Sequence, residues 1–258
     1  ETFEEFWEEW GNKQNDSIGA ILFMIGELEH RHKRAILKDE SHVRIVNKLV
    51  KYLESIEYWH DKDSGMWEED EEVHASSVGA CVAGLRSVSR LKKIRVPAYL
   101  IDNGEETLKH LLPRESKRKF VDMALLSLVW PYNVVSPVQR EEILKNVEYL
   151  LLRRRGVIRY KNDHYYNKNL DGYSEEAEWC FGISWLAIIY EAAGNMRKAS
   201  KLVRRMLVTV TPKGVPELYF SNSKKHNENN PLGWAESLFI VAVHDTNAKL
   251  IRTKKVKA

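Results

Sequence analysis

The chain has 258 residues, of which 43% are hydrophobic and 30% charged, and 40 Lys and Arg residues against 37 Asp and Glu leave a net charge of +3. This is the composition of a globular chain that can bury a large core, in one large domain or two small ones. Because the charge is small and evenly mixed, it gives no reason to expect nucleic acid or an anionic membrane as a partner. No run approaches the roughly 18 consecutive apolar residues of a membrane helix.

The two cysteines, Cys81 and Cys180, lie far apart, each within an apolar helical pattern. This placement favours buried free thiols in a reducing compartment over a disulfide framework. We therefore expect a cytoplasmic protein.

Helical periodicity runs along nearly the whole chain. Apolar residues recur at helical spacing from Ile18 to Leu28 and from Val43 to Ile56. The same spacing and the start and stop residues predict further helices at 75–92, 104–112, 117–130, 137–153, 175–193, 196–209 and 232–245. The prediction is nine helices. No segment sustains the period-two alternation of a strand, which argues against a sheet-based core.

The helices are of two kinds. The segment 233–243 is apolar on nearly every side, whereas 137–153 carries a charged side. Fully buried helices that alternate with amphipathic ones indicate two concentric layers. Without a fixed repeat signature, an open solenoid is disfavoured. We expect an all-α double-layered helical barrel that forms a single domain over 1–258.

Three connecting segments are long, polar and aromatic: 59–74, 154–174 and 211–231. Long loops in a compact domain are usually functional or disordered. The Tyr, Trp, Pro and Gly residues within these three favour order, so they are the first places to look for chemistry.

The loop 59–74 is rich in carboxylates and has three interpretations. It can be a solvated acidic run. It can be a calcium loop, with Asp61, Asp63 and Glu72 at positions one, three and twelve, but Gly65 stands at position five where the EF-hand needs glycine at six. It can also hold the Glu68 carboxyl against the preceding Trp67 ring, where desolvation would raise the pKa and keep a proton available for donation.

The other two loops carry one arginine and one glutamate of interest. Arg159 lies near Tyr160, Asp163 and further tyrosines in the sequence. Such a set can form an ion pair at the surface, bind a phosphate group, or hold sugar hydroxyls through hydrogen bonds. Glu217 lies between prolines and aromatic residues, which place it rigidly, although a helix-flanking surface glutamate is the alternative.

Four short motifs occur in order along the chain. They are Trp-Gly-x-x-Gln-x-Asp from Trp10 to Asp16, Gly-x-Trp-Glu-Glu from Gly65 to Glu69, Arg-Tyr-x-x-Asp-x-Tyr-Tyr from Arg159 to Tyr166, and Pro216-Glu217 followed by Gly233-Trp234. In this order they resemble the active-site loops of glycoside hydrolase family 15, the glucoamylases and their relatives. The segment 65–79 is also similar to the glucoamylase-like regulatory subunits of phosphorylase kinase.

The resemblance implies an (α/α)6-toroid fold and a set of site residues. Glu68 would be the general acid of an inverting exo-acting α-glucosidase, and Glu217 the general base. The implied substrate-binding residues are Trp10, Trp67, Glu69, Arg159, Tyr160, Asp163 and Trp234. The implied partner is an oligosaccharide or polysaccharide of the starch or glycogen type, with the linkage left open.

Inversion requires the two carboxyls to converge to roughly 6.5–9.5 Å, which leaves room for a water. Six predicted helices lie between Glu68 and Glu217, and an even number brings both loops to the same end of a helical barrel. This acid–base chemistry implies no cofactor and no metal. The histidines His30, His32 and His42 lie on charged helix faces and are expected at the surface.

The chain departs from the family pattern at its beginning. The Trp10 motif, which the family places after its third helix, comes almost at the first residue, and no Arg-Asp dipeptide like the one that grips the terminal sugar occurs. About three N-terminal helices are therefore expected to be missing. The chain can be a fragment, a reduced relative that no longer hydrolyses, or a half completed by another polypeptide. Alternatives to an enzyme are a non-catalytic glucan-binding or regulatory domain and a helical scaffold.

Overall fold

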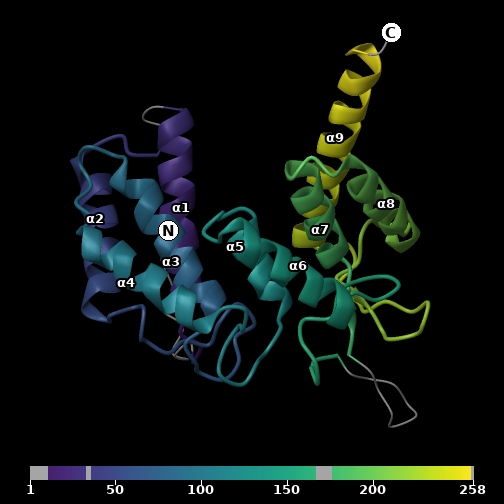
Figure 1. Cartoon of the computed structure of the whole chain (residues 1–258), viewed down its shortest axis with the longest axis horizontal. Coiled ribbons are helices and arrows are strands. Elements are labelled where there is room, and N and C mark those ends of the chain that lie inside the picture. Colours follow the sequence, from purple (N-terminus) through teal and green to yellow (C-terminus); the bar gives the residue numbers. More distant parts are fainter. Residues whose placement is uncertain (1–10, 33–35, 167–175, 257–258) are drawn as a thin grey trace, which may run out of the picture. The chain divides into compact units, whose positions relative to one another are not determined.

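The structure of the chain, a computed structural model, describes residues 11–32, 36–166 and 176–256 (Figure 1). The chain divides into two compact units. Unit 1 comprises Glu1–Phe120 and Pro131–Val135, and unit 2 comprises Val121–Trp130 and Ser136–Ala258. The described residues form nine α-helices and two strands of two residues each. The predicted all-α class is confirmed.

Unit 1 contains four helices: α1 (Asn15–Arg31), α2 (Glu40–Ser55), α3 (Ala75–Ser89) and α4 (Ala98–Leu111). Helix α3 lies in the middle of the core, buried on nearly every side, and packs against α1 and α4. Helix α4 begins directly after Pro97, six residues before the predicted start at 104.

Unit 2 contains α5 (Leu126–Val129), α6 (Pro137–Leu150), α7 (Phe181–Ala192), α8 (Met196–Met206) and α9 (Gly233–Val256). Helix α7, apolar on nearly every side, is the core helix and packs against α8 and α9. Helix α6 begins where the sequence predicts, with Pro137 in its first turn and a capping box between Ser136 and Gln139.

Helices α4 and α9 differ from the prediction at one end, since α9 continues to Val256 instead of ending at 245. Two further predicted helices are much shorter than expected. The single helix expected at 117–130 is only a 3₁₀ turn, η1 (Met123–Leu125), followed by the four-residue α5, because the Asp122 side chain caps Ala124 and starts a new turn there. The helix expected at 175–193 begins at Phe181. The residues before it form β1 (Glu178–Trp179), which pairs antiparallel with β2 (Leu218–Tyr219).

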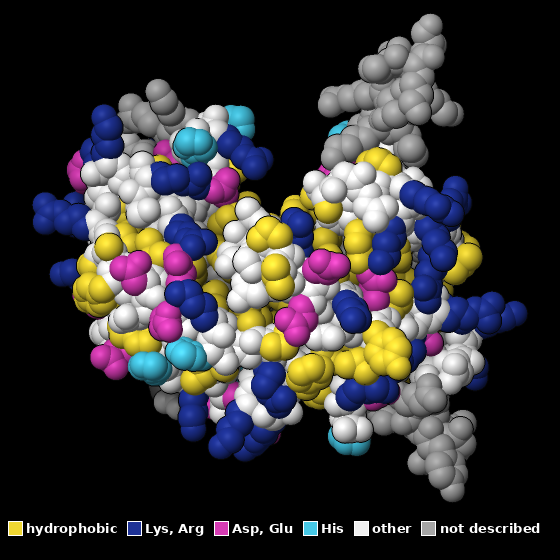
Figure 2. Space-filling view, in the orientation of Figure 1, with side chains coloured by type: hydrophobic (Ala, Val, Ile, Leu, Met, Phe, Trp, Pro, Cys, Tyr) yellow, Lys and Arg dark blue, Asp and Glu magenta, His cyan; other side chains and the backbone are white. Residues whose placement is uncertain are grey.

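The two cysteines are buried free thiols, as predicted. Burial raises the pKa of both, so neither is a reactive thiolate near neutral pH. Lys and Arg side chains are interspersed with Asp and Glu on the face in Figure 2, in keeping with the small net charge. Among the described residues, no helix has the length and apolar character to cross a membrane.

The contact between α1 and α3 depends on glycine. A Cβ added at Gly19 would lie 2.4 Å from the carbonyl carbon of Ala80, and one added at Gly84 would lie 2.5 Å from the carbonyl oxygen of Gly19. The two backbones thus approach more closely than any side chain allows. This approach sets the distance between the helices at the centre of unit 1.

Gly84→Ala should therefore push α1 away from α3 and lower the free energy of unfolding by about 1–3 kcal/mol, the usual cost of overpacking. Urea denaturation followed by circular dichroism measures it. Gly11→Ala is the matched control, since nothing lies within 4 Å of a Cβ at that position. Equal stability of the two variants would contradict the packing argument.

Candidate active site

The loop that carries Glu68 is closed at its base by backbone pairing. The Asp63 N–H donates to the Glu72 carbonyl at 3.0 Å, and the Glu72 N–H donates to the Asp63 carbonyl at 3.1 Å. The buried Asp63 carboxylate also accepts the backbone N–H of Asn15 at 2.9 Å, and Ser64 N–H donates to the Lys13 carbonyl at 2.7 Å. These contacts fix the loop to the start of α1.

Glu68 occupies a left-handed backbone conformation, with φ at +59°. A non-glycine residue there costs about 1–2 kcal/mol, and glycine would avoid that cost. The Glu68 side chain is exposed, so burial of this side chain does not compensate for the cost of its left-handed backbone. The expectation that the Trp67 ring shields this carboxyl is therefore not met in unit 1. The left-handed turn at Glu68 leaves its carboxyl group exposed to solvent.

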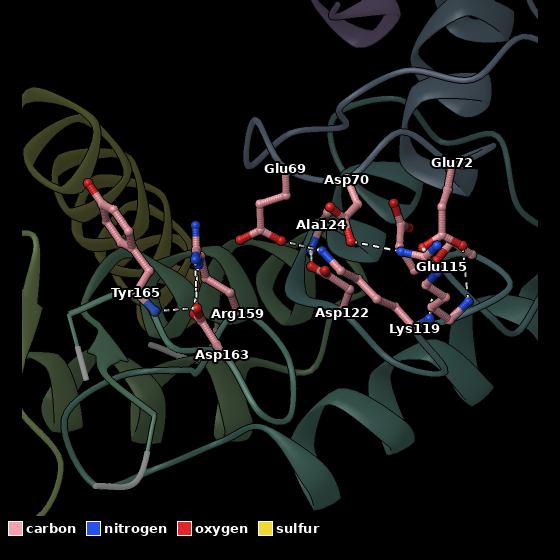
Figure 3. Close-up of polar contacts among 12 residues, drawn as sticks. Glu69, Asp70, Glu72, Glu115, Lys119, Asp122, Ala124, Arg159, Asp163 and Tyr165 are labelled. Carbon is pink, nitrogen blue, oxygen red and sulfur yellow. Dashed lines mark hydrogen bonds and ion pairs between the residues drawn. The ribbon is translucent and has the colours of Figure 1, made fainter. Parts of the chain in front are cut away.

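The neighbouring carboxylates of this loop are tied to residues 115–119. Glu69 Oε2 forms an ion pair with Lys119 Nζ at 2.6 Å, and Asp70 pairs with Arg118 at 2.7 Å (Figure 3). The Arg118 N–H also donates to Glu72 at 3.1 Å. The loop is thus not a freely solvated acidic run. The Glu69–Lys119 pair sets an acceptor beside a donor, the combination that a sugar hydroxyl needs.

The buried side chain of His74 packs against the loop that carries Glu68. Its ring is 3% exposed and lies against Gly65, where an added Cβ would meet it at 3.0 Å. His74 Nδ1 lies 3.3 Å from Glu115 Oε1, and Ser76 Oγ donates to the same oxygen at 2.6 Å. Burial by itself lowers the pKa of His74, but the hydrogen bond and charge of Glu115 and the charge of Asp63 outweigh it and raise the pKa to about 9. His74 is therefore charged at neutral pH.

In unit 2, Arg159 and Asp163 form a buried bidentate pair. Arg159 Nε donates to Asp163 Oδ2 at 2.7 Å, and a terminal guanidinium nitrogen donates to Oδ1 at 2.6 Å (Figure 3). Aromatic rings surround the guanidinium, with centroids at 4.9 Å for Tyr165, 5.1 Å for Trp179 and 5.7 Å for Tyr160. The ion pair therefore fixes the three rings around it, which we call the aromatic platform.

Glu217 is positioned by its own backbone. Its carbonyl accepts the Cys180 N–H at 3.0 Å, and its N–H donates to the Asn229 carbonyl at 2.9 Å. Its carboxylate oxygen Oε2 accepts the side-chain amides of Asn227 at 2.5 Å and Asn229 at 2.7 Å. The two asparagines are absent from the sequence prediction, because asparagine in a loop indicates only a turn.

The Arg159 platform and the Glu217 segment belong to one site in unit 2. The ring of Tyr165 stacks on that of Trp179 and contacts that of Tyr166 edge-on, with centroids 4.8 Å apart. The hydroxyl of Tyr166 donates to Glu228, between the two asparagines, at 3.1 Å. The sequence-predicted residues Arg159, Tyr160, Asp163 and Glu217 are thus connected through a short series of contacts.

Trp234, the second residue of α9, is 41% exposed and stacks on Phe181 with ring centroids 4.2 Å apart. Phe181 follows Cys180, which binds the Glu217 backbone, so Trp234 lies beside the segment that carries the predicted base. Trp10 lies outside the described residues.

The calcium interpretation of the 59–74 loop has no support in the described residues. Lys13 Nζ donates to Asp61 at 2.6 Å, while Asp63 and Glu72 pair through their backbones. Within the described ranges no group of three or more His, Cys, Asp or Glu side chains could hold a metal ion.

The all-α fold is that of the glucoamylase-like proteins, as the following comparisons show. The profile of Glycosyl hydrolases family 15 matches residues 4–243, and the chain belongs to this family. It is similar to a glycosidase of known structure with a TM-score of 0.73 and 19% identity, over 95% of this chain and 70% of that one. A bacterial glucoamylase complexed with acarbose matches with a TM-score of 0.67 and 17% identity, over 92% of this chain and 41% of that one.

Two kinds of curated relative match in sequence. A probable phosphorylase b kinase regulatory subunit alpha of Caenorhabditis elegans is 25% identical over 90% of this chain and 23% of its own length. An uncharacterized glycosyl hydrolase of Methanocaldococcus jannaschii is 24% identical over 92% of this chain and 43% of its own length. The chain thus spans less than half the length of these relatives.

The stability of unit 1 should depend on pH through His74. Its pKa is about 9 in the folded chain against an ordinary 6.5, so between these values the folded state keeps a proton that the unfolded chain releases. The contribution, on the order of 3 kcal/mol, is complete below the unfolded value and is lost as pH rises through about 9. Urea denaturation at about pH 6 and about pH 9.5 measures the difference.

His74→Asn should reduce this pH difference, because the variant has no imidazole to titrate. His60→Asn is the control: His60 is exposed and makes no contact with Glu115 in the described structure, so its replacement should leave the difference intact. An unchanged difference in His74→Asn would show that other groups cause it.

Proposed function

We propose that the chain carries the catalytic carboxylates of an inverting exo-acting α-glucosidase that acts on starch-type, glycogen-type or related oligosaccharides. The observation that carries the proposal is Glu68, an exposed carboxyl held at φ +59° on a loop closed by backbone pairing, at the position that the family motif marks as the acid. Glu217, fixed through its backbone and by two amides, supplies the base.

In the proposed reaction, Glu68 donates its proton to the glycosidic oxygen as the bond from that oxygen to the anomeric carbon breaks. A water attacks the anomeric carbon from the opposite face and gives one proton to Glu217. One water is consumed, and the sugar leaves with inverted configuration. The proposal requires the two carboxyls to come within roughly 6.5–9.5 Å of each other in the working enzyme.

The substrate would lie on aromatic faces and charged pairs. In unit 2 we assign it Arg159 with Asp163, Tyr160 and Trp234, and in unit 1 Trp67 and the Glu69–Lys119 pair. Trp10 belongs to the same proposal by its motif. Because no Arg-Asp dipeptide occurs in the sequence, we propose that a segment outside this chain, or a complementary chain, grips the terminal sugar. The two buried free thiols support a reducing, cytoplasmic location.

Glu68→Gln and Glu217→Gln in the full-length protein should each lower kcat by about 10²–10⁴-fold, because each removes a proton donor or acceptor while keeping the side-chain shape. Glucose release from α-1,4-, α-1,6- and α,α-1,1-linked glucosides measures activity, and calorimetry checks that the variants still bind. Wild-type rates in both variants would overturn the proposal.

A second test separates function from stability at the strained position. Glu68→Gly should keep or slightly raise the free energy of unfolding, by up to about 1 kcal/mol, since glycine accepts positive φ, yet it should abolish glucose release. Glu57→Gly is the matched control, because Glu57 is also an exposed glutamate at positive φ, +48°, but follows α2. Equal activity of the two glycine variants would remove Glu68 from the mechanism.

The kinase-subunit relatives favour one alternative, a glucan-binding or regulatory domain without turnover. Under that alternative, the wild-type protein binds maltooligosaccharides in calorimetry and releases no glucose from them. Glucose release excludes it.

A further inference from the structure

The segment after Glu217 returns antiparallel to it. Leu232 N–H donates to the Val215 carbonyl at 3.0 Å, Glu217 N–H to the Asn229 carbonyl at 2.9 Å, and Asn227 N–H to the Leu218 carbonyl at 3.3 Å. The whole stretch from 215 to 232 is therefore a hairpin-like loop whose returning side lies opposite Glu217.

Along an extended segment, side chains alternate between its two sides. Asn227 and Asn229 both reach the Glu217 carboxylate, at 2.5 and 2.7 Å, while Glu228 between them accepts the Tyr166 hydroxyl at 3.1 Å. The alternation thus directs both amides to the predicted base and the Glu228 carboxylate to Tyr166, with which the Asn227 side chain also forms a hydrogen bond.

The two amides bind the same oxygen of Glu217, Oε2. Among the described residues, Oε1 of Glu217 accepts no hydrogen bond. A carboxylate with one oxygen held by two donors cannot rotate freely, and its other oxygen keeps its lone pairs for a proton. That is the arrangement a general base requires, because proton transfer demands a fixed and unoccupied acceptor.

We propose that Asn227 and Asn229 are positioning residues for the base: they hold Glu217 Oε2 so that Oε1 faces the attacking water. The inference rests on the proposed function. It predicts that losing either amide slows the reaction without weakening substrate binding, since neither amide is assigned a contact with the sugar.

Asn229 is the better test position, because its side chain is exposed and its loss should not disturb the core. In the full-length protein, Asn229→Ala should lower kcat roughly 10- to 100-fold, the effect of one hydrogen bond to a charged group. KM should change less than about twofold. Asn229→Gln, which keeps the amide, should recover part of kcat.

Two further variants complete the experiment. Asn227→Asp keeps the volume at a buried position but puts a like charge against Glu217, and it should lower kcat at least as much. Asn230→Ala is the control: Asn230 is an amide in the same loop that donates to Thr211 Oγ1 at 2.9 Å and does not reach Glu217. Its kcat should stay within about twofold of the wild type.

The outcomes separate this inference from the proposed function. If Glu217→Gln retains the wild-type kcat, the proposed function fails. If Glu217→Gln abolishes turnover while Asn229→Ala and Asn227→Asp keep kcat within about twofold, only the positioning inference is wrong. A loss of kcat accompanied by a matching rise in KM and a lower thermal midpoint would show a merely structural role and would also overturn it.

Discussion

The loops of the candidate site depend on buried carboxylates that accept backbone N–H groups. Asp63 accepts the N–H of Asn15, Glu115 that of Ser76, Asp163 that of Tyr165, and Glu178 that of Arg155. All four carboxylates are at most 2% exposed. An irregular loop, which holds Arg155 and Tyr165, and the first turn of a helix, which holds Asn15 in α1 and Ser76 in α3, both leave backbone donors without a partner of their own. A donor buried without a partner costs about 1–3 kcal/mol. The carboxylates supply the missing acceptors.

This use of carboxylates divides the acidic residues into two groups. A buried ion is stable only with partners, so Asp163 has Arg159, and Glu115 has His74 and Ser76. Glu68 and Glu217 differ, since Glu68 is exposed and Glu217 is half-buried. Carboxylates of the second kind are the ones placed to exchange a proton with a substrate or a water, as proposed for Glu68 and Glu217. The chain has many charged residues but a net charge of only +3. Some of these residues form ion pairs and hydrogen bonds inside the loops, and others lie on the solvated surface.

The periodicity of apolar residues predicts most helices of the chain. It fails to predict where a side-chain contact interrupts a helix. The α6 start at Pro137 is evident from its capping residues. The helix expected at 117–130 is cut short because the Asp122 side chain caps a new turn at Ala124. The residues before it, Arg118 and Lys119, bind Asp70 and Glu69 of a distant loop instead. Such a tertiary contact leaves no local pattern. The candidate site follows the same rule: motifs indicate Glu217 and Arg159, but the amides of Asn227 and Asn229 become visible only when the returning segment pairs with its partner.

The sequence relatives of the chain include an uncharacterized glycosyl hydrolase and a probable kinase regulatory subunit, so the fold alone does not decide between turnover and binding. The backbone conformation of Glu68 and the hydrogen bonds of Glu217 give more information on this question. A glutamate at φ +59° is costlier than glycine, and a carboxylate that binds two amides through one oxygen leaves acceptor capacity unused on the other. Neither feature improves the packing of a helical scaffold. The second feature suits a base that must take a proton from a water, and for this reason we propose hydrolysis rather than a purely regulatory role.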